Sequence, residues 1–377
     1  MKFGTKLIHN GNEIDKTTGA LSIPIYQAST YNKMDIDKPQ EFDYSRSGNP
    51  TRKALEDTIA KLEGGNRGFA FSSGMAATSS VLSIFSAGDH IVVCEDVYGG
   101  TYRIFTSYFN RFKLDVTFVD AADLETVRKS IKENTRAIFL ETPSNPLLKI
   151  TDLKSAVQIA MEHNLITIID NTFMSPYLQR PIELGIDIVI HSATKFIGGH
   201  SDVLAGLVVV KDPSLAERIH SVQMGFGAVL GPQDCWLLLR GLKTLKVRLD
   251  YQQDNAGRLA KWLKEQSKVK QVFYPGLDNH EGRDIHFGQA DGAGAVLSFK
   301  TVDEETTRKF MKNIKLAAVA VSLGGVETIV SYPAKMSHAA VPKEERDRLG
   351  ITDNLIRVSV GLEDFEDLID DFGRALY

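Results

Sequence analysis

One short segment constrains this chain more than any other. Residues 186–190 are mostly apolar and predict a buried strand, and the chain then runs through Ser192 and Thr194 to Lys195, ahead of two glycines. A lysine that leaves a sheet beside hydroxyls and glycines is chemically suited to hold a phosphorylated aldehyde as a Schiff base. The segment therefore predicts a covalent ligand site at the end of a strand.

A second buried strand is predicted at 165–169, and it also ends in a charged residue, Asp170. The stretch between Asp170 and Lys195 has room for one crossover helix, so the two strands are expected to be parallel neighbours. Their ends then offer a carboxylate and an amine to one crevice. Pyridoxal phosphate (PLP) needs this pair, because the amine binds its aldehyde and the carboxylate keeps its pyridine nitrogen protonated.

Apolar segments alternate with helix-length stretches from a predicted helix at 51–62 to about residue 245. This order predicts an α/β fold with a mostly parallel sheet, covered on both faces and binding ligands at the carboxyl ends of its strands. The predicted strands are 68–71, 90–93, 115–119, 137–140, 165–169, 186–190 and 206–210.

A chain of 377 residues is longer than one hydrophobic core usually grows, which favours two domains. We expect an N-terminal arm over 1–55, a large ligand-binding domain over 56–248 and a small α+β domain over 249–377. The arm is rich in Thr, Asn, Asp, Gly and Pro, and a long irregular arm is best ordered on a neighbouring subunit. A helix is predicted from 235 to 249 and on to 263, with later strands at 272–274, 295–299 and 355–360.

Composition narrows the possible partners. The 44 basic and 48 acidic residues give a formal charge of −4, which provides no reason to expect nucleic acid or an anionic membrane as partner. With Cys94 and Cys235 as the only cysteines, we expect buried thiols rather than disulfides, and no metal site. No apolar run approaches about 20 residues and no signal peptide is recognisable, so a cytoplasmic location is expected.

Several segments together carry a family resemblance. The stretch 187–201 resembles the lysine signature of the Cys/Met-metabolism PLP enzymes, the cystathionine γ-synthase-like family. Further family-like segments follow one another in order over nearly the whole chain, at 44–51, 71–75, 96–101, 141–146 and 322–325. The resemblance implies the PLP-dependent transferase-like fold (aspartate aminotransferase-like, fold type I), with a mostly parallel seven-stranded sheet and a smaller C-terminal α+β domain.

The resemblance also implies the residues that hold the cofactor. Lys195 matches the Schiff-base lysine and the base that takes the Cα proton, and Asp170 matches the partner of the pyridine nitrogen. Tyr98 matches a tyrosine that stacks on the ring and acts in catalysis, although a tyrosine closing a turn is the plainer alternative. The phosphate would lie on the glycine turn and the hydroxyls of the lysine loop, at Gly74, Met75, Ser192 and Thr194.

Tyr44 and Arg46 match residues that bind the same phosphate from a neighbouring subunit, which implies that a lone monomer has an incomplete site. The alternative for both is a solvated loop. Family members of this kind usually form homotetramers built as dimers of dimers. A homo-oligomer is therefore expected.

Substrate binding is expected at Arg357, on a predicted strand whose apolar residues face the other way. A guanidinium there suits an amino-acid carboxylate, and it matches the family's carboxylate arginine. Ser322 and Asn145 match supporting positions. Arg103 is a candidate for the distal end of the substrate, although exposed arginines are common.

The reaction is predicted from two positions at which this chain differs from related enzymes. Val321 stands where γ-acting relatives often have glutamate, and Gly99 with Gly100 lacks the cysteine typical of methionine γ-lyases. We expect a PLP-dependent carbon–sulfur lyase of methionine biosynthesis that cleaves L-cystathionine at Cβ into L-homocysteine, pyruvate and ammonia, with cysteine desulfhydrase side activity. The alternatives are a cystathionine γ-lyase and an O-acylhomoserine thiol-lyase or cystathionine γ-synthase.

Two other classes of protein are weighed against this enzyme. A PLP-fold scaffold would be expected to lack the lysine or the aspartate, and both are present. A nicotinamide oxidoreductase requires a glycine fingerprint that directly follows a strand, and the glycines at 225, 227 and 231 do not provide one.

Overall fold

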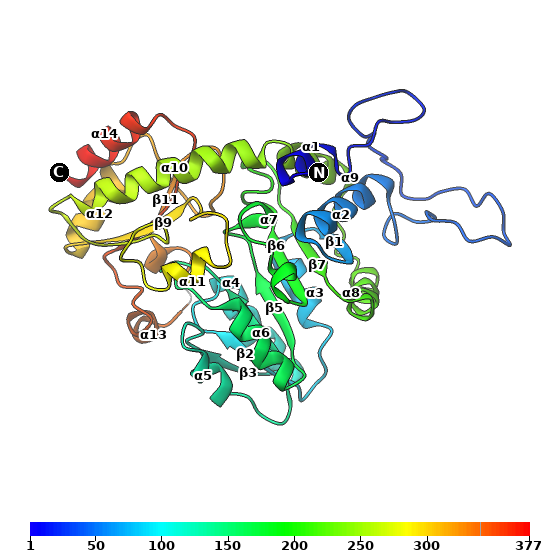
Figure 1. Ribbon diagram of the computed structural model, residues 1–377, viewed down its shortest axis with the longest axis horizontal. Helices are drawn as coiled ribbons and strands as arrows, with labels where there is room; N and C mark the ends of the chain where they lie inside the picture. The colour runs from blue at the N-terminus through cyan, green and yellow to red at the C-terminus, as the bar shows by residue number, and fades with distance from the viewer. Residues whose placement is uncertain (340) are drawn as a thin grey trace.

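A computed structural model describes residues 1–339 and 341–377. The chain builds two sheets that lie side by side in Figure 1, with the seven-stranded sheet towards the centre and the five-stranded sheet near the C-terminus. Each sheet has its own cluster of buried apolar side chains. The domain limits expected from the sequence stay a prediction.

The large sheet has the strand order β1-β7-β6-β5-β4-β2-β3. Only β7 runs antiparallel to its neighbours, so the predicted α/β fold with a mostly parallel sheet is confirmed. Every predicted strand is present, because short apolar runs that are buried on both faces leave little ambiguity. The strands are β1 (Arg67–Phe71), β2 (His90–Cys94), β3 (Asp115–Val119), β4 (Thr135–Glu141), β5 (Ile166–Asp170), β6 (Ile188–Ser192) and β7 (Gly206–Val210).

Helices cover the two faces of this sheet, with α6 in front of it and α3 behind it in Figure 1. The buried core around the large sheet includes Cys94 and Cys235, which are free thiols as predicted. The longer helices are α2 (Pro50–Glu63), α3 (Gly74–Leu82), α6 (Leu153–Glu162), α8 (Pro213–Phe226) and α9 (Pro232–Leu242). The shorter ones are α4 (Gly99–Arg103), α5 (Leu124–Lys129), α7 (Ser175–Leu178), α11 (Arg283–Phe287) and α13 (Lys343–Arg348).

The small sheet packs against α10 (Leu245–Lys264), α12 (Glu304–Asn313) and α14 (Phe365–Leu376). Its core contains a row of phenylalanines that meet edge to face, with ring centroids 5.6 Å apart for Phe299 and Phe310 and 5.3 Å apart for Phe310 and Phe372. The strands are β8 (Val269–Phe273), β9 (Val296–Thr301), β10 (Ala318–Val319), β11 (Ile329–Ser331) and β12 (Leu355–Ser359).

The single helix predicted from 235 to 263 is wrong in one respect, because the chain breaks it into α9 and α10 at Lys243 and Thr244. Arg248 provides the physical reason. Its guanidinium donates to the carbonyl of Gly241 at the end of α9 and to the carbonyl of Phe196 just after the lysine loop. The break thus lets one buried arginine satisfy two carbonyls from different parts of the chain.

The N-terminal arm projects from the body at the upper right of Figure 1. It begins with a short helix that the sequence pattern does not predict, α1 (Phe3–His9), and residues 10–49 are irregular apart from a bridge between Thr30 and Tyr44. The arm exposes large apolar side chains, including Leu21, Met34 and Ile36. Its contact with a neighbouring subunit stays a prediction.

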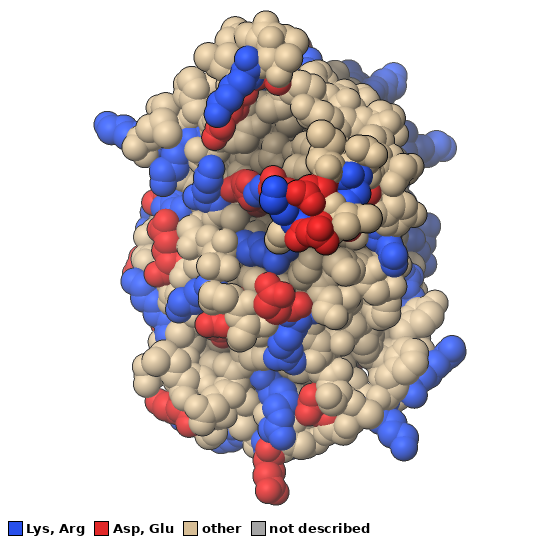
Figure 2. All heavy atoms as spheres, turned by 90° about the vertical axis from the view of Figure 1, so that its right-hand side faces the viewer, with Lys and Arg blue, Asp and Glu red and all other residues tan. Residues whose placement is uncertain are grey.

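The surface carries charges of both signs. On the face that bears the arm, lysines and arginines are interspersed with aspartates and glutamates (Figure 2), in keeping with a formal charge of −4. None of the helices described over 1–339 and 341–377 is both long and apolar enough to cross a membrane.

Asp371 on α14 offers a test of how the small sheet is held. Its carboxylate is buried and accepts backbone N–H groups of Lys315, Leu316 and Ala317 at 2.8–3.2 Å. Asp371→Ala should lower the free energy of unfolding by about 2–4 kcal/mol, because it removes a charged acceptor from these donors. Urea denaturation measures this, and the exposed neighbour Asp370→Ala should change it by less than about 0.5 kcal/mol. Equal effects of the two variants would contradict the prediction.

Candidate active site

A cavity of about 670 Å³ lies at the carboxyl ends of the large sheet's strands, where the small sheet approaches. This is the edge at which parallel α/β sheets bind ligands. Its walls come from both sheets, so residues far apart in the sequence share one space. Of the residues predicted for the site, the cavity brings together Gly74, Met75, Tyr98, Arg103, Asn145, Asp170, Ser192, Thr194, Lys195, Ser322 and Arg357.

Lys195 follows β6 and points its ammonium group at the small-sheet side of the cavity. Its Nζ donates to Ser322 Oγ at 2.5 Å. Burial, reinforced by the positive charge of Arg357, lowers the pKa of Lys195 to about 8, although Asp170 opposes the shift. The amine is therefore far more often neutral at physiological pH than an exposed lysine is.

Asp170 is the last residue of β5, as expected from the sequence. Its Oδ1 accepts the hydroxyl of Thr172 at 2.5 Å and the backbone N–H of Thr172 at 3.0 Å. The same hydroxyl oxygen accepts the backbone N–H of Ser192 at 2.8 Å and so ties the ends of β5 and β6 together. Burial raises the pKa of Asp170, while the Thr172 bonds and the positive charges nearby act in the opposite direction.

The glycine turn before α3 forms a tight corner beside the lysine loop. Ser73 caps α3 by accepting the backbone N–H of Ala76 at 3.0 Å. A Cβ atom on Gly74 would lie 2.9 Å from Ser192 Cβ and 3.0 Å from Ser192 Oγ, so only glycine allows this approach. The corner offers a helix N-terminus and hydroxyl groups to one anion.

Tyr98 lines the cavity from the N-terminus of α4, and its backbone is held by a buried carboxyl group. The N–H of Tyr98 donates to Glu141 Oε2 at 2.9 Å. Glu141 ends β4 directly opposite Asp170 on β5. Burial and, second to it, the charge of Asp170 raise the pKa of Glu141 well above its ordinary value, so we infer that Glu141 is the neutral member of the two.

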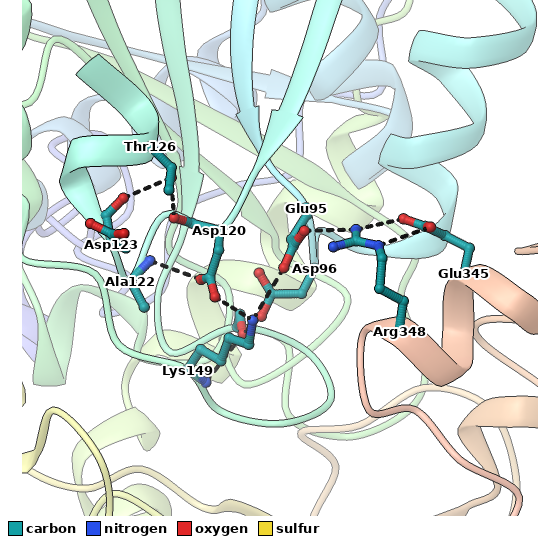
Figure 3. A network of polar contacts seen from close by, with 10 residues as sticks. Glu95, Asp96, Asp120, Ala122, Asp123, Thr126, Lys149, Glu345 and Arg348 are labelled. Carbon is teal, nitrogen blue, oxygen red and sulfur yellow. Dashed lines mark hydrogen bonds and ion pairs between the residues drawn. The ribbon is translucent and has the colours of Figure 1, made fainter. Parts of the chain in front are cut away.

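A network of polar contacts lies behind the Tyr98 loop (Figure 3). Glu95 accepts from Lys149 at 3.3 Å and from Arg348 of α13 at 2.7 Å. Asp96 contacts Ser144, and burial raises the pKa of Asp96 to about 6. Because Arg348 comes from the small-sheet side, the network joins the two parts of the chain.

Arg357 on β12 is buried, with 3% of its surface exposed. Its Nη1 donates to Asn145 Oδ1 at 3.0 Å and its Nη2 to the Ser322 carbonyl at 2.7 Å, while its Nε has no partner within the described part of the chain. Burial lowers its pKa to about 10, so the group stays cationic at neutral pH. A buried cation with a free donor is suited to bind a carboxylate.

Two of the predicted residues do not line the cavity. Tyr44 and Arg46 are exposed on the arm, where Arg46 Nη1 donates to the Met224 carbonyl at 3.0 Å. Their role in a neighbouring site stays a prediction. Arg103 lines the cavity from α4 and is exposed, which agrees with a place at the mouth.

The sequence reading missed several lining residues. Glu141 could have been found, because it ends a strand with a carboxylate just as Asp170 does. Thr172 lies two residues after Asp170 and gives no pattern of its own. Met336, Ser337 and Ala339 line the cavity from an irregular segment of the small-sheet side, and their sequence carries no signal for such a place.

The comparisons with known proteins agree with this geometry. A family model described as "Cys/Met metabolism PLP-dependent enzyme" matches residues 4–377. The chain belongs to this family.

Individual relatives are also similar over nearly the whole length. A cystathionine β-lyase of Bacillus subtilis is 56% identical, covering 99% of this chain and 95% of that protein. A cystathionine γ-lyase of the same organism is 50% identical, covering 100% and 99%. The solved structure of a cystathionine γ-lyase from Lactobacillus plantarum, complexed with L-serine, matches with a TM-score of 0.97 and 47% identity, covering 100% and 98%. The predictions of a PLP cofactor and of a PLP-dependent carbon–sulfur lyase are thereby confirmed.

The residues in the cavity fit this cofactor. Lys195 offers an amine of lowered pKa, Asp170 offers a carboxylate one strand away, and the corner at Gly74 offers donors for a phosphate. These three groups match the aldehyde, the ring nitrogen and the phosphate of PLP in chemistry.

Glu141 provides a test of the Tyr98 anchor. Glu141→Gln should keep kcat/KM within about threefold, because a neutral amide still accepts the Tyr98 N–H, whereas Glu141→Ala should lower it about tenfold or more. Steady-state kinetics with the enzyme's amino-acid substrate measure both variants. If Glu141→Gln fell as far as Glu141→Ala, an ionised carboxylate at this position would be required.

The lowered pKa of Lys195 predicts how the apoprotein takes up PLP. Only the neutral amine attacks an aldehyde, so the rate of covalent attachment should rise with pH and level off above about pH 8. Stopped-flow absorbance after mixing apoprotein with PLP measures this rate, and Lys195→Ala is the control that forms no covalent band. A rate that kept rising towards pH 10 would show an unperturbed lysine.

Proposed function

We propose that this enzyme catalyses the α,β-elimination of L-cystathionine to L-homocysteine, pyruvate and ammonia, a step of methionine biosynthesis. The observation that carries the proposal is one cavity in which Lys195, Asp170 and Arg357 meet and whose lining includes the apolar Val321. Lys195 and Asp170 would bind the cofactor, and Arg357 would bind the carboxylate of an amino-acid substrate. The residues around the far end of the substrate would then determine which amino acid is accepted.

The cofactor would be held by residues at the strand ends. Lys195 would bind the aldehyde of PLP, Asp170 the pyridine nitrogen, and Tyr98 one face of the ring. Bound PLP supplies an electron sink that stabilises negative charge at the substrate Cα. The phosphate would be held by Gly74, Met75, Ser192 and Thr194, and by Tyr44 and Arg46 of a second copy of the chain.

The substrate would be oriented by its α-carboxylate. Arg357 is held by Asn145 and Ser322, and its Nε has no hydrogen-bond partner among residues 1–339 and 341–377. Such a fixed cation loses little entropy when it binds a carboxylate. With the carboxylate held there, the Cα–H bond would face Lys195.

Lys195 would act as the base once the substrate's amino group had replaced it at the aldehyde. Its pKa of about 8 makes the neutral amine about two orders of magnitude more abundant at neutral pH than in an ordinary lysine. The amine takes the proton from Cα, the Cβ–S bond breaks, and homocysteine leaves as a thiol after taking up a proton. Water then releases pyruvate and ammonia from the remaining three-carbon fragment.

Cleavage at Cβ rather than Cγ is supported by the distal wall. Val321 is 66% exposed beside the cavity and is apolar, so it offers no carboxylate to a distal ammonium group. Arg103 lies at the mouth and suits a distal carboxylate. The same cavity would accept cysteine, since only the Cβ–S bond must match. Cysteine desulfhydrase activity is therefore expected as a side activity.

The alternative functions are cystathionine γ-lyase and O-acylhomoserine thiol-lyase or cystathionine γ-synthase. The relatives include γ-acting enzymes that are 50% and 46% identical to this chain, so these activities are the second candidates. We further propose a homotetramer built from two catalytic dimers in the cytoplasm. The exposed apolar side chains of the arm, such as Met34 and Ile36, support contact with another subunit.

Product analysis tests the reaction. Purified enzyme incubated with L-cystathionine should yield homocysteine and pyruvate in equal amounts, measured by chromatography of the derivatised thiol and by a coupled lactate dehydrogenase assay. Val321→Glu should shift part of the turnover to cysteine and 2-oxobutyrate, because a carboxylate would then face the distal ammonium. Cysteine and 2-oxobutyrate as main products of the unchanged enzyme would overturn the proposal.

A further inference from the structure

A buried polar cluster lies behind the cofactor edge of the large sheet and has no part in the chemistry proposed above. Its centre is Glu63, the last residue of α2, whose Oε1 lies 2.6 Å from His191 Nε2. The side chains are 0% and 1% exposed. Asn171 Nδ2 donates to the same oxygen at 3.2 Å.

The cluster extends to a fourth side chain. Gln179 Nε2 donates to Asn171 Oδ1 at 3.0 Å and to the Thr142 carbonyl at 3.2 Å. Asn171 Nδ2 donates in turn to the Gln179 carbonyl at 2.9 Å. The amide of Asn171 is thus fixed on both sides, and the cluster is sealed from solvent because all its members are buried.

Two members of the cluster are direct chain neighbours of cavity residues. Asn171 directly follows Asp170, and His191 directly precedes Ser192. Successive side chains on a strand point to opposite faces, so the cluster holds the reverse side of the strand ends that present Asp170 and Ser192 to the cavity.

A role in stability alone explains the cluster poorly. Taking a carboxylate and an imidazole out of water is unfavourable, and well-packed apolar residues often stabilise a core as much as a buried pair does. Three buried polar atoms also have no partner among the residues described: Glu63 Oε2, His191 Nδ1 and Gln179 Oε1. Such an arrangement is better explained by a role in positioning the strand ends that carry Asp170 and Ser192.

The cluster also connects to the arm through α2. Near the start of that helix, Arg52 donates to the carbonyls of Ser45 at 2.6 Å and Arg46 at 3.2 Å. Glu63 lies at the other end of the helix. One rigid helix therefore runs from the arm residues to the reverse side of β5 and β6.

We propose that Glu63 is a positioning residue for the cofactor site, which through His191 and Asn171 holds the ends of β6 and β5 where Ser192 and Asp170 contact the cofactor. This inference rests on the proposed assignment of those two residues to PLP. Glu63 itself touches neither cofactor nor substrate. Its effect is on how well the site is formed before PLP arrives.

The test measures PLP affinity of the apoprotein by fluorescence titration, together with thermal unfolding of the same apoprotein. Glu63→Ala should raise the Kd for PLP about tenfold or more. Glu63→Gln should keep it within about threefold, because the amide oxygen still accepts from His191 and Asn171. The absorption band of bound PLP should be broadened or shifted in Glu63→Ala and unchanged in Glu63→Gln.

Glu56→Ala is the matched control. Glu56 lies on the same helix and accepts the Ala70 N–H at 2.9 Å and a Gln223 Nε2–H at 3.3 Å, so it contacts the edge strand β1 rather than β5 or β6. Glu56→Ala should lower the unfolding temperature and leave the Kd for PLP within about threefold. If Glu63→Ala and Glu56→Ala lowered stability alike and neither changed the Kd, Glu63 would be structural only and the proposal would be overturned.

Two further variants keep the result decisive. Asn171→Ala breaks the link from Glu63 to β5 and should raise the Kd for PLP even if Glu63→Ala does not fold, so an unchanged Kd in this variant counts against the proposal. Asp170→Ala tests the cofactor role of Asp170 separately from the positioning role of Glu63. If that variant bound PLP with unchanged Kd and absorption, the assignment of Asp170 would fail, whereas the Glu63 variants test positioning alone.

Discussion

The geometry of the site depends on the register between β5 and β6. This register sets Asp170 and the chain leading to Lys195 at neighbouring strand ends, and Thr172 joins them by bonding both the Asp170 carboxylate and the Ser192 N–H. A slip of one residue would turn Asp170 or Ser192 to the other face of the sheet. Because the strands are apolar and buried on both faces, such a slip would be unfavourable. The packing of the core therefore sets the positions of Asp170 and Ser192.

The second constraint is that the cavity is shared between two sheets. Arg357 and Ser322 come from the small-sheet side, and Ser322 contacts Lys195 by its hydroxyl and Arg357 by its carbonyl. Gly324 makes this approach possible: a Cβ atom there would lie 2.6 Å from the Phe196 nitrogen, and its φ of +80° suits glycine. The Glu95–Arg348 contact, shown in Figure 3, also joins the two parts of the chain.

The sequence predicts most of what lies on the large sheet, because strand ends and glycine turns are local patterns. Lys195 and Asp170 could be found for this reason, and Glu141 obeys the same pattern although it was not singled out. The break between α9 and α10 could not be predicted, since it depends on Arg248 reaching Phe196 far away in sequence. The same holds for Met336, whose place in the cavity is set by packing between the sheets and not by local sequence.

The pKa values of the carboxyl groups in the site depend more on their burial than on their ion pairs. Three carboxyl groups, those of Asp96, Glu141 and Asp170, gather at the ends of neighbouring strands, and burial raises the pKa of each. Of these, Asp170 has the Thr172 hydroxyl and the positive charge of Lys195 to favour its ionised form. In the proposed assignment, a cationic ring nitrogen would favour the ionised form of Asp170 further, whereas the raised pKa of Glu141 favours the neutral form of the group that accepts the Tyr98 N–H. Two carboxyl groups on adjacent strands thereby serve different purposes because their surroundings differ.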